Sequence, residues 1–157
     1  MSDISENELK VFVDAVTRYF SHITREQAAV KSAYLSDQEV TPGCGDYTGL
    51  ITFSGGFRGC VYFSAPAQLV RSLLHDMEER DLSEYNFLDA VGEIANTIAG
   101  NARRHFGENL EISTPVTIVG LPDRIQTNAR ARPFVILLSW KRYQASVVVD
   151  LQRVEAE

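Results

Sequence analysis

Glu93 and Asn96 are polar residues three positions apart, and their side chains could act together on a bound group. A carboxylate accepts hydrogen bonds and pairs with cations, whereas a carboxamide both accepts and donates hydrogen bonds. At about 100° per residue, a helix would place them with Asp89 and Gly100 within an arc of roughly 60°. On the pattern alone, that arc fits an ordinary solvated helix face or a surface that meets another protein.

The helix that carries these residues is predicted from Ser83 to about Phe106 and stops before Gly107, which is expected to cap its C-terminus. Gly92 and Ala99 beside the polar arc are small, so the surface of another protein could approach the helix backbone closely. A purely solvated face would more often carry long charged side chains, because these are good helix formers. The other side of the helix is apolar and is expected to pack in the core: Leu88, Val91, Ala95, Ile98, Ala102 and Phe106.

Other elements must position this helix. Ser5 and Glu8 have the spacing of a capping box ahead of a helical stripe of apolar residues. Gly55 and Gly56 predict the turn of a β-hairpin, and Ser64 is expected to cap a second helix. The expected elements are helices over residues 5–23, 66–79 and 83–106, and strands over residues 28–35, 47–53, 57–63, 112–119, 133–140 and 145–151.

The chain length fits a single domain, residues 1–157, because 157 residues with 45% hydrophobic content allow one sizeable core and hardly two. The element order predicts an α+β (α/β layered) fold in which long helices pack on a mixed, largely antiparallel sheet. Each half has a helix followed by strands that include a hairpin, and residues 14–16 repeat in residues 89–91. This indicates pseudo-duplicated helix and strand units, or a coincidence between two amphipathic helices.

Composition excludes several classes of function. The formal net charge of −6 argues against nucleic acid as a partner. No stretch approaches the roughly 20 apolar residues that span a bilayer, so we expect a soluble, cytoplasmic protein that does not bind membranes. Cys44 and Cys60 are expected to be ordinary thiols of a reducing compartment. His22, His75 and His105 lack the spacing of a metal site, so no metal is expected.

The run D-A-V-G-E-I-A-N at residues 89–96 resembles the signature of the CheC/CheX/FliY family. That signature has Asp or Ser, then Glu four positions later, then Asn three positions after Glu, with a proline downstream. Pro115 matches the proline but follows Asn96 after a shorter gap than usual. The likeness covers nearly the whole chain in element order, and further segments resemble the CheX branch in particular: residues 93–101, 112–115 and 59–64.

The resemblance implies a phosphatase that dephosphorylates the phospho-aspartate of a CheY-like response regulator, in chemotaxis or another two-component pathway. Asn96 would orient the attacking water, which suits a carboxamide because phosphoryl transfer depends mostly on positioning and charge stabilisation. Glu93 would pair with the phosphate-site lysine of the receiver, its accepted role in the family. A general-base role is the alternative, but a carboxylate aimed at an anionic phosphoryl group is repelled unless a cation intervenes.

The same resemblance bears on the remaining site residues, cofactors and partners. Asp89 matches the first position of the signature and would support the rim of the interface, or else only solvate the helix. Gly92, Gly100 and Arg103 are assigned with it to partner binding. The receiver would supply the magnesium ion, Mg²⁺, and this chain would need no cofactor of its own. CheX-like proteins are typically homodimers, and exposed edge strands favour pairing with a second copy.

Two other functions stay open at this point. The helix could dock on a receiver or a motor-switch component as a non-catalytic adaptor, although an adaptor has no evident need for the Asn96 amide. A small-molecule sensor would require a closed apolar pocket, which a sequence does not reveal.

Overall fold

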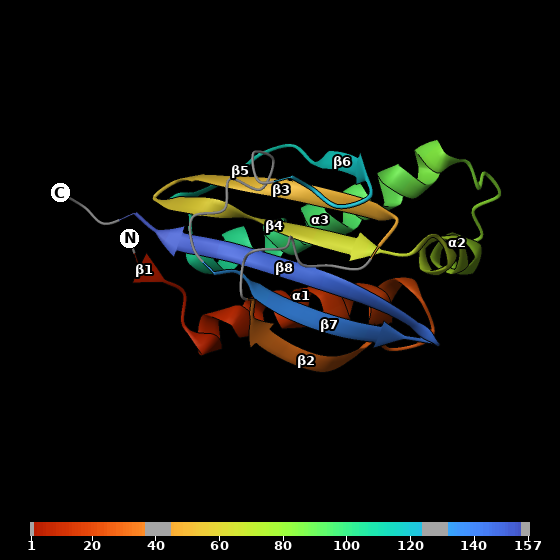
Figure 1. Cartoon of the computed structure of the whole chain (residues 1–157), viewed down its shortest axis with the longest axis horizontal. Coiled ribbons are helices and arrows are strands. Elements are labelled where there is room, and N and C mark those ends of the chain that lie inside the picture. Colours follow the sequence, from red (N-terminus) through yellow and green to blue (C-terminus); the bar gives the residue numbers. More distant parts are fainter. Residues whose placement is uncertain (1, 37–44, 124–131, 155–157) are drawn as a thin grey trace.

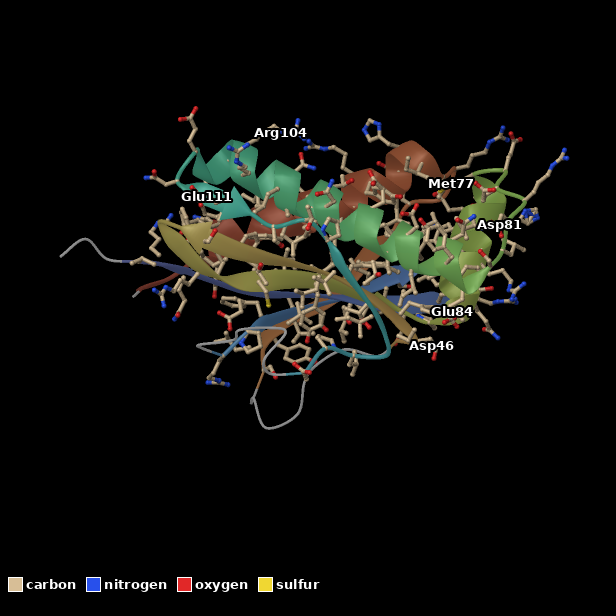
Figure 2. All side chains as sticks on the ribbon, turned by 90° about the horizontal axis from the view of Figure 1, so that it is seen from above. Asp46, Met77, Asp81, Glu84, Arg104 and Glu111 are labelled. Carbon is tan, nitrogen blue, oxygen red and sulfur yellow. The ribbon has the colours of Figure 1, made fainter. Side chains whose placement is uncertain are left out.

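The computed structural model describes residues 2–36, 45–123 and 132–154, and its helices cover one face of a sheet (Figure 1). Helices α1 (Glu6–Ile23) and α3 (Glu84–Phe106) run side by side across that face, while α2 (Ala67–Asp76) lies near one end. Figure 2 shows the helices as a layer of their own above the strands. The strands are β1 (Ser2–Asp3), β2 (Ala29–Leu35), β3 (Tyr47–Gly55), β4 (Phe57–Ala65), β5 (Leu110–Ile112), β6 (Val116–Val119), β7 (Phe134–Trp140) and β8 (Tyr143–Arg153).

The sheet has eight strands in the order β2-β7-β8-β4-β3-β5, with β1 paired to β8 and β6 paired to β3. Every pairing among the described residues is antiparallel, which confirms the largely antiparallel sheet expected from the sequence. The two halves of the chain contribute to this strand order in the same way. The strand after α1 pairs with the β7–β8 hairpin, and the strands after α3 pair with the β3–β4 hairpin. This exchange between halves supports the pseudo-duplicated unit.

The first helix begins at the expected capping box. Glu8 N–H donates to Ser5 Oγ at 3.2 Å, and Ser5 N–H donates to Glu8 Oε1 at 3.0 Å, so two free helix-end donors are satisfied reciprocally. The buried side of α1 meets the end of α3, where the Phe12 and Phe106 rings lie 6.2 Å apart. Phe106 also contacts Phe57 of β4, with ring centroids 5.5 Å apart. The aromatic cluster therefore fixes α1 and α3 against the sheet at this end.

The strand expected over residues 112–119 is two strands, β5 and β6, that both pair with β3. Between them Ser113 still bonds to Thr52, its N–H donating at 3.0 Å to the Thr52 carbonyl and its Oγ accepting at 2.9 Å from the Thr52 N–H. Pro115 has no N–H to offer to a ladder, so the regular pairing stops before it. The sequence pattern was apolar on both sides of this break and did not reveal it.

The helix expected over residues 66–79 differs at both ends. Ser64, the expected cap, is buried inside β4. The N–H of Ala67 at the start of α2 donates instead to Asp46 Oδ2 at 2.8 Å. The helix ends early, and Glu78 then adopts a φ of 61°, outside the right-handed helical region. The cap is therefore supplied by a residue distant in sequence.

Three expectations from composition can be compared with the described residues. In this part of the chain, no helix is long and apolar enough to cross a membrane. No group of three His, Cys, Asp or Glu side chains within residues 2–36, 45–123 and 132–154 is placed to hold a metal ion. Cys60 is buried in β4, and this burial raises the pKa of its thiol. Cys44 lies outside the described residues.

We predict that Glu8→Gln weakens the fold through the loss of one ion pair. Arg153 on β8 donates to Glu8 Oε1 at 3.0 Å, and its hydrogen bonds lower the pKa of Glu8 from 4.5 to about 2. Gln retains the cap, so the loss should be about 0.5–1 kcal/mol at neutral pH, as for a solvent-screened ion pair. A carboxylate whose pKa is lowered by folding stabilises the folded state at pH values above its unfolded pKa. This stabilisation is lost as the pH falls through its folded pKa.

The difference in free energy of unfolding between wild type and Glu8→Gln should therefore have its full size at pH 7. It should shrink below about pH 4.5 and disappear as the pH falls through about 2. Urea unfolding at a series of pH values measures it. Glu6→Gln is the matched control, because Glu6 lies in the same helical turn and has no ion pair within the described residues. A deficit that stays constant down to pH 2 would assign the effect to something other than this pair.

Candidate functional site

The polar face of α3 is a straight exposed stripe. Asp89, Glu93, Asn96 and Arg103 are exposed, and Gly100 between them is partly exposed. These positions follow the helical spacing that the sequence predicts, and the helix begins after Ser83 and ends at Gly107 as expected. Gly107 has a φ of 93°, a conformation that glycine adopts at little cost at a helix end. The predicted stripe therefore exists, with five of the six expected site residues on it.

Gly92 is the exception, because it is buried beside the stripe, and its assignment to partner binding stays a prediction. An ideal Cβ added to Gly92 would lie 2.9 Å from Thr117 Cγ2 and 3.5 Å from Pro115 Cβ. The β6 segment covers this side of the helix. Ala99 is also fully buried, so of the small residues beside the stripe only Gly100 leaves the backbone open, with no atom within 4 Å of an added Cβ.

Pro115 lies against the helical turn that carries Glu93. Its Cβ is the second atom that a side chain at Gly92 would meet, one residue before Glu93. The shorter gap between Asn96 and Pro115 still brings the proline to the helix. The break between β5 and β6 at this proline therefore lies next to the polar stripe.

A second glycine, Gly49 of β3, sets how closely α3 sits on the sheet. An ideal Cβ on Gly49 would lie 2.1 Å from the carbonyl oxygen of Val91 and 2.8 Å from the N atom of Gly92. The backbone of α3 therefore rests directly on the backbone of β3, two residues before Glu93. Gly49 was not among the residues predicted to shape the site, although a glycine inside a strand is a signal of close backbone approach.

The side chains of Glu93 and Asn96 have no hydrogen-bond or ion-pair partner among the described residues. Their neighbours on the helix are engaged instead. Thr97 Oγ1 donates to the Glu93 carbonyl at 2.9 Å, Asn101 Nδ2 donates to the Thr97 carbonyl at 3.0 Å, and Arg103 Nε donates to the Leu110 carbonyl at 3.2 Å. The carboxylate and carboxamide are therefore left free to bind groups that come from another molecule.

Tyr19 of α1 is the buried titratable group beside Glu93. Burial, together with the negative charge of Glu93, raises the pKa of Tyr19 to about 12. The phenol is therefore neutral at physiological pH and adds no second negative charge to the site. Because Tyr19 packs between α1 and α3, it also links the stripe to the neighbouring helix.

A family model described as "Chemotaxis phosphatase CheX" matches residues 47–139. The matched range includes the β3–β4 hairpin, α2, all of α3 and both strands beside it. No curated protein matches the chain. The family match thus covers more than half of the chain and contains every residue of the polar stripe.

Solved structures of similar fold cover almost the whole chain. The chemotaxis protein CheX from Vibrio vulnificus has a TM-score of 0.78 at 21% identity, covering 93% of this chain and 99% of its own. A CheC-like superfamily protein from Shewanella has a TM-score of 0.79 at 18% identity, covering 95% and 99%. A CheX-CheY-BeF3-Mg²⁺ complex from Borrelia burgdorferi has a TM-score of 0.73 at 14% identity, covering 93% and 98%. These likenesses establish the fold.

Proposed function

The chain belongs to the CheX family of chemotaxis phosphatases, and on this premise we propose that it hydrolyses the phospho-aspartate of a CheY-like response regulator. The observation that carries the proposal is the free pair of Glu93 and Asn96 on the exposed stripe of α3. The Borrelia burgdorferi structure of similar fold is a complex with CheY, which supports a receiver domain as the partner. The pathway is chemotaxis or another two-component system.

Asn96 orients the attacking water. Its carboxamide oxygen accepts a hydrogen bond from the water, and its NH₂ donates to the water or to a phosphoryl oxygen. Hydrolysis of a phosphoryl group requires a nucleophile held in line with the leaving oxygen, and little covalent chemistry is left to the protein. The exposed position of Asn96, without an internal partner in the described part of the chain, suits insertion into the receiver's phosphorylation site.

Glu93 docks the receiver through a salt bridge to its phosphate-site lysine. The carboxylate lies one helical turn before Asn96 on the same face, so both side chains can reach one receiver. A general-base role is less favourable, because the carboxylate would be repelled by the anionic phosphoryl group. Asp89, Gly100 and Arg103 border the same interface, with Gly100 allowing close approach. The magnesium ion and the phosphorylated aspartate are those of the receiver.

The oligomer and location that we propose are a homodimer and the cytoplasm. Strand β2 lies at one edge of the sheet and is exposed along its whole length, with Val30, Tyr34 and Leu35 among the exposed hydrophobic residues. Such an edge favours pairing with a second copy. Sedimentation equilibrium gives the mass directly, and a mass of one chain, 17.5 kDa, would contradict the dimer.

The proposal is tested by the decay of a phosphorylated receiver from the same cell, with and without substoichiometric protein. We expect acceleration with turnover. Glu93→Ala should raise the receiver concentration for half-maximal rate by about tenfold, since a hydrogen bond to a charged group contributes about 1.5–3 kcal/mol. The rate at saturation should change much less, whereas loss of a general base would lower it strongly.

Glu6→Ala is the matched control for this substitution, because Glu6 is an exposed glutamate at the start of α1, outside the polar stripe. It should leave both kinetic constants unchanged. Binding of the phosphorylated receiver without any acceleration of its decay would replace the phosphatase with the second candidate, a non-catalytic receiver-binding or motor-switch adaptor.

A further inference from the structure

A groove of about 500 Å³ lies between α1 and α3 and borders the polar stripe. Figure 2 labels two of its lining residues, Arg104 and Met77, on the helix side of the molecule away from the sheet. Glu93 lines the groove as well, so the groove is continuous with the proposed site. Any protein that covers Glu93 and Asn96 therefore lies next to the groove entrance.

The groove is more basic than the protein as a whole. Its lining includes the guanidinium groups of Arg18 and Arg104, against the single carboxylate of Glu93. The whole chain has a formal net charge of −6, so the sign is reversed locally. Arg104 donates to Asn101 Oδ1 at 3.0 Å, but neither arginine has an ion pair within the part of the chain that the structure describes. Both are therefore available to acidic groups of a partner.

Apolar side chains line much of the rest of the groove, together with the polar residues His22, Thr97 and Asn101. Ala15 and Tyr19 are buried between the helices, whereas Ile23 and Met77 are 38% and 44% exposed, respectively. An apolar lining with a basic rim favours a protein segment with apolar and acidic side chains on one face. Amphipathic helices commonly bind in grooves of this kind, with their apolar face inward.

We infer that the groove docks a helix of the same response regulator whose phosphoryl group meets Asn96, an inference that rests on the proposed function. This helix presents acidic side chains to Arg18 and Arg104 and apolar ones to Tyr19, Ile23 and Met77. Glu93 lines the groove and Asn96 does not, so the groove contributes to recognition of the receiver and not to hydrolysis. Charge complementarity at such a rim acts mainly on association and on the choice of partner.

The test compares Arg18→Glu with Arg58→Glu. Arg58 is an exposed arginine of β4, and its strand neighbours of the same parity, Cys60 and Tyr62, belong to the cluster on the sheet face away from the helices. The two variants therefore carry the same change of charge on opposite faces. Arg18→Glu should weaken binding of a receiver loaded with beryllofluoride and Mg²⁺ by about tenfold at low salt, and Arg58→Glu should not.

Two further readouts separate docking from damage to the fold. The rate of dephosphorylation at saturating receiver should stay near that of wild type for Arg18→Glu, and its affinity should depend less on salt. Ile23→Ser, at the apolar rim, should weaken binding severalfold without this change in salt dependence. Both variants should unfold at nearly the temperature of wild type, because the two side chains are exposed.

The possible failures differ from one another. If wild type accelerates decay and Arg18→Glu binds the receiver as tightly as Arg58→Glu does, the groove inference falls and the phosphatase stands. If wild type neither binds nor dephosphorylates any receiver of the cell, the proposed function itself fails. If Arg18→Glu changes the sedimentation mass and leaves the affinity for the receiver unchanged, the groove contacts a second copy of this chain, and the inference is overturned.

Discussion

Asn96→Ala is expected to lower the rate of receiver dephosphorylation at saturation on the order of 100-fold, while the affinity for the receiver stays nearly unchanged. In the proposed mechanism the carboxamide holds the water in line, an interaction made fully only in the transition state. Truncation to Ala removes this group from an exposed helix position without leaving a buried cavity. Single-turnover decay of the phosphorylated receiver measures the rate, and binding of the beryllofluoride-loaded receiver measures the affinity.

Asn7→Ala is the matched control for Asn96→Ala. Asn7 is an exposed asparagine in the first turn of α1, outside the polar stripe and the groove. It should leave both the rate and the affinity at wild-type values. Equal activity of Asn96→Ala and wild type would exclude water positioning by this amide. A loss of affinity with an unchanged rate at saturation would instead make Asn96 a docking residue.

The expected effects of Glu93→Ala and Asn96→Ala differ in kind. Removal of the carboxylate should raise the receiver concentration for half-maximal rate, whereas removal of the amide should lower the rate at saturation. A double variant should show both defects, and because both side chains would contact one receiver under the proposal, the two effects need not add. Such a pattern would separate docking from catalysis on two residues that share one helix face.

The parts of the site that follow local rules could be predicted from the sequence. The periodicity of α3 placed Glu93 and Asn96 on an exposed stripe, and Ser83 and Gly107 gave its ends, because caps and helical phase depend on nearby residues. The capping box of α1 was predicted for the same reason. The alternation of apolar residues gave most strands, although it did not give their order.

The parts that depend on distant segments could not be predicted. Helical phase places Gly92 near the edge of the stripe, but only the return of the chain at Pro115 and Thr117 buries it. Likewise, the cap of α2 comes from Asp46, which a local pattern cannot identify. The groove beside Glu93 requires α1 and α3 to lie side by side, so Arg18 could not be connected with the site from the sequence alone.

Gly49→Ala is expected to destabilise the fold by roughly 1–3 kcal/mol, because the new methyl group meets backbone atoms that cannot rotate away. The Val91 carbonyl oxygen would lie 2.1 Å from it, so α3 must move off β3. For a chain of this size, the melting temperature should fall by about 2–4 °C per kcal/mol. Thermal unfolding measures the loss, and unchanged stability would show that α3 can shift on the sheet without cost.

Gly100→Ala is the matched opposite case, since its added Cβ meets no atom within 4 Å. Alanine is the better helix former, so the variant should gain about 1 kcal/mol of stability. If a receiver approaches the helix backbone at Gly100, this more stable variant should nevertheless bind the receiver more weakly.

Gly49→Ala should have the complementary defect: the displaced helix carries Asn96 with it, so the rate at saturation falls even at temperatures where the variant is fully folded. A Gly49→Ala variant with a wild-type rate at saturation would contradict the positioning role of this close contact.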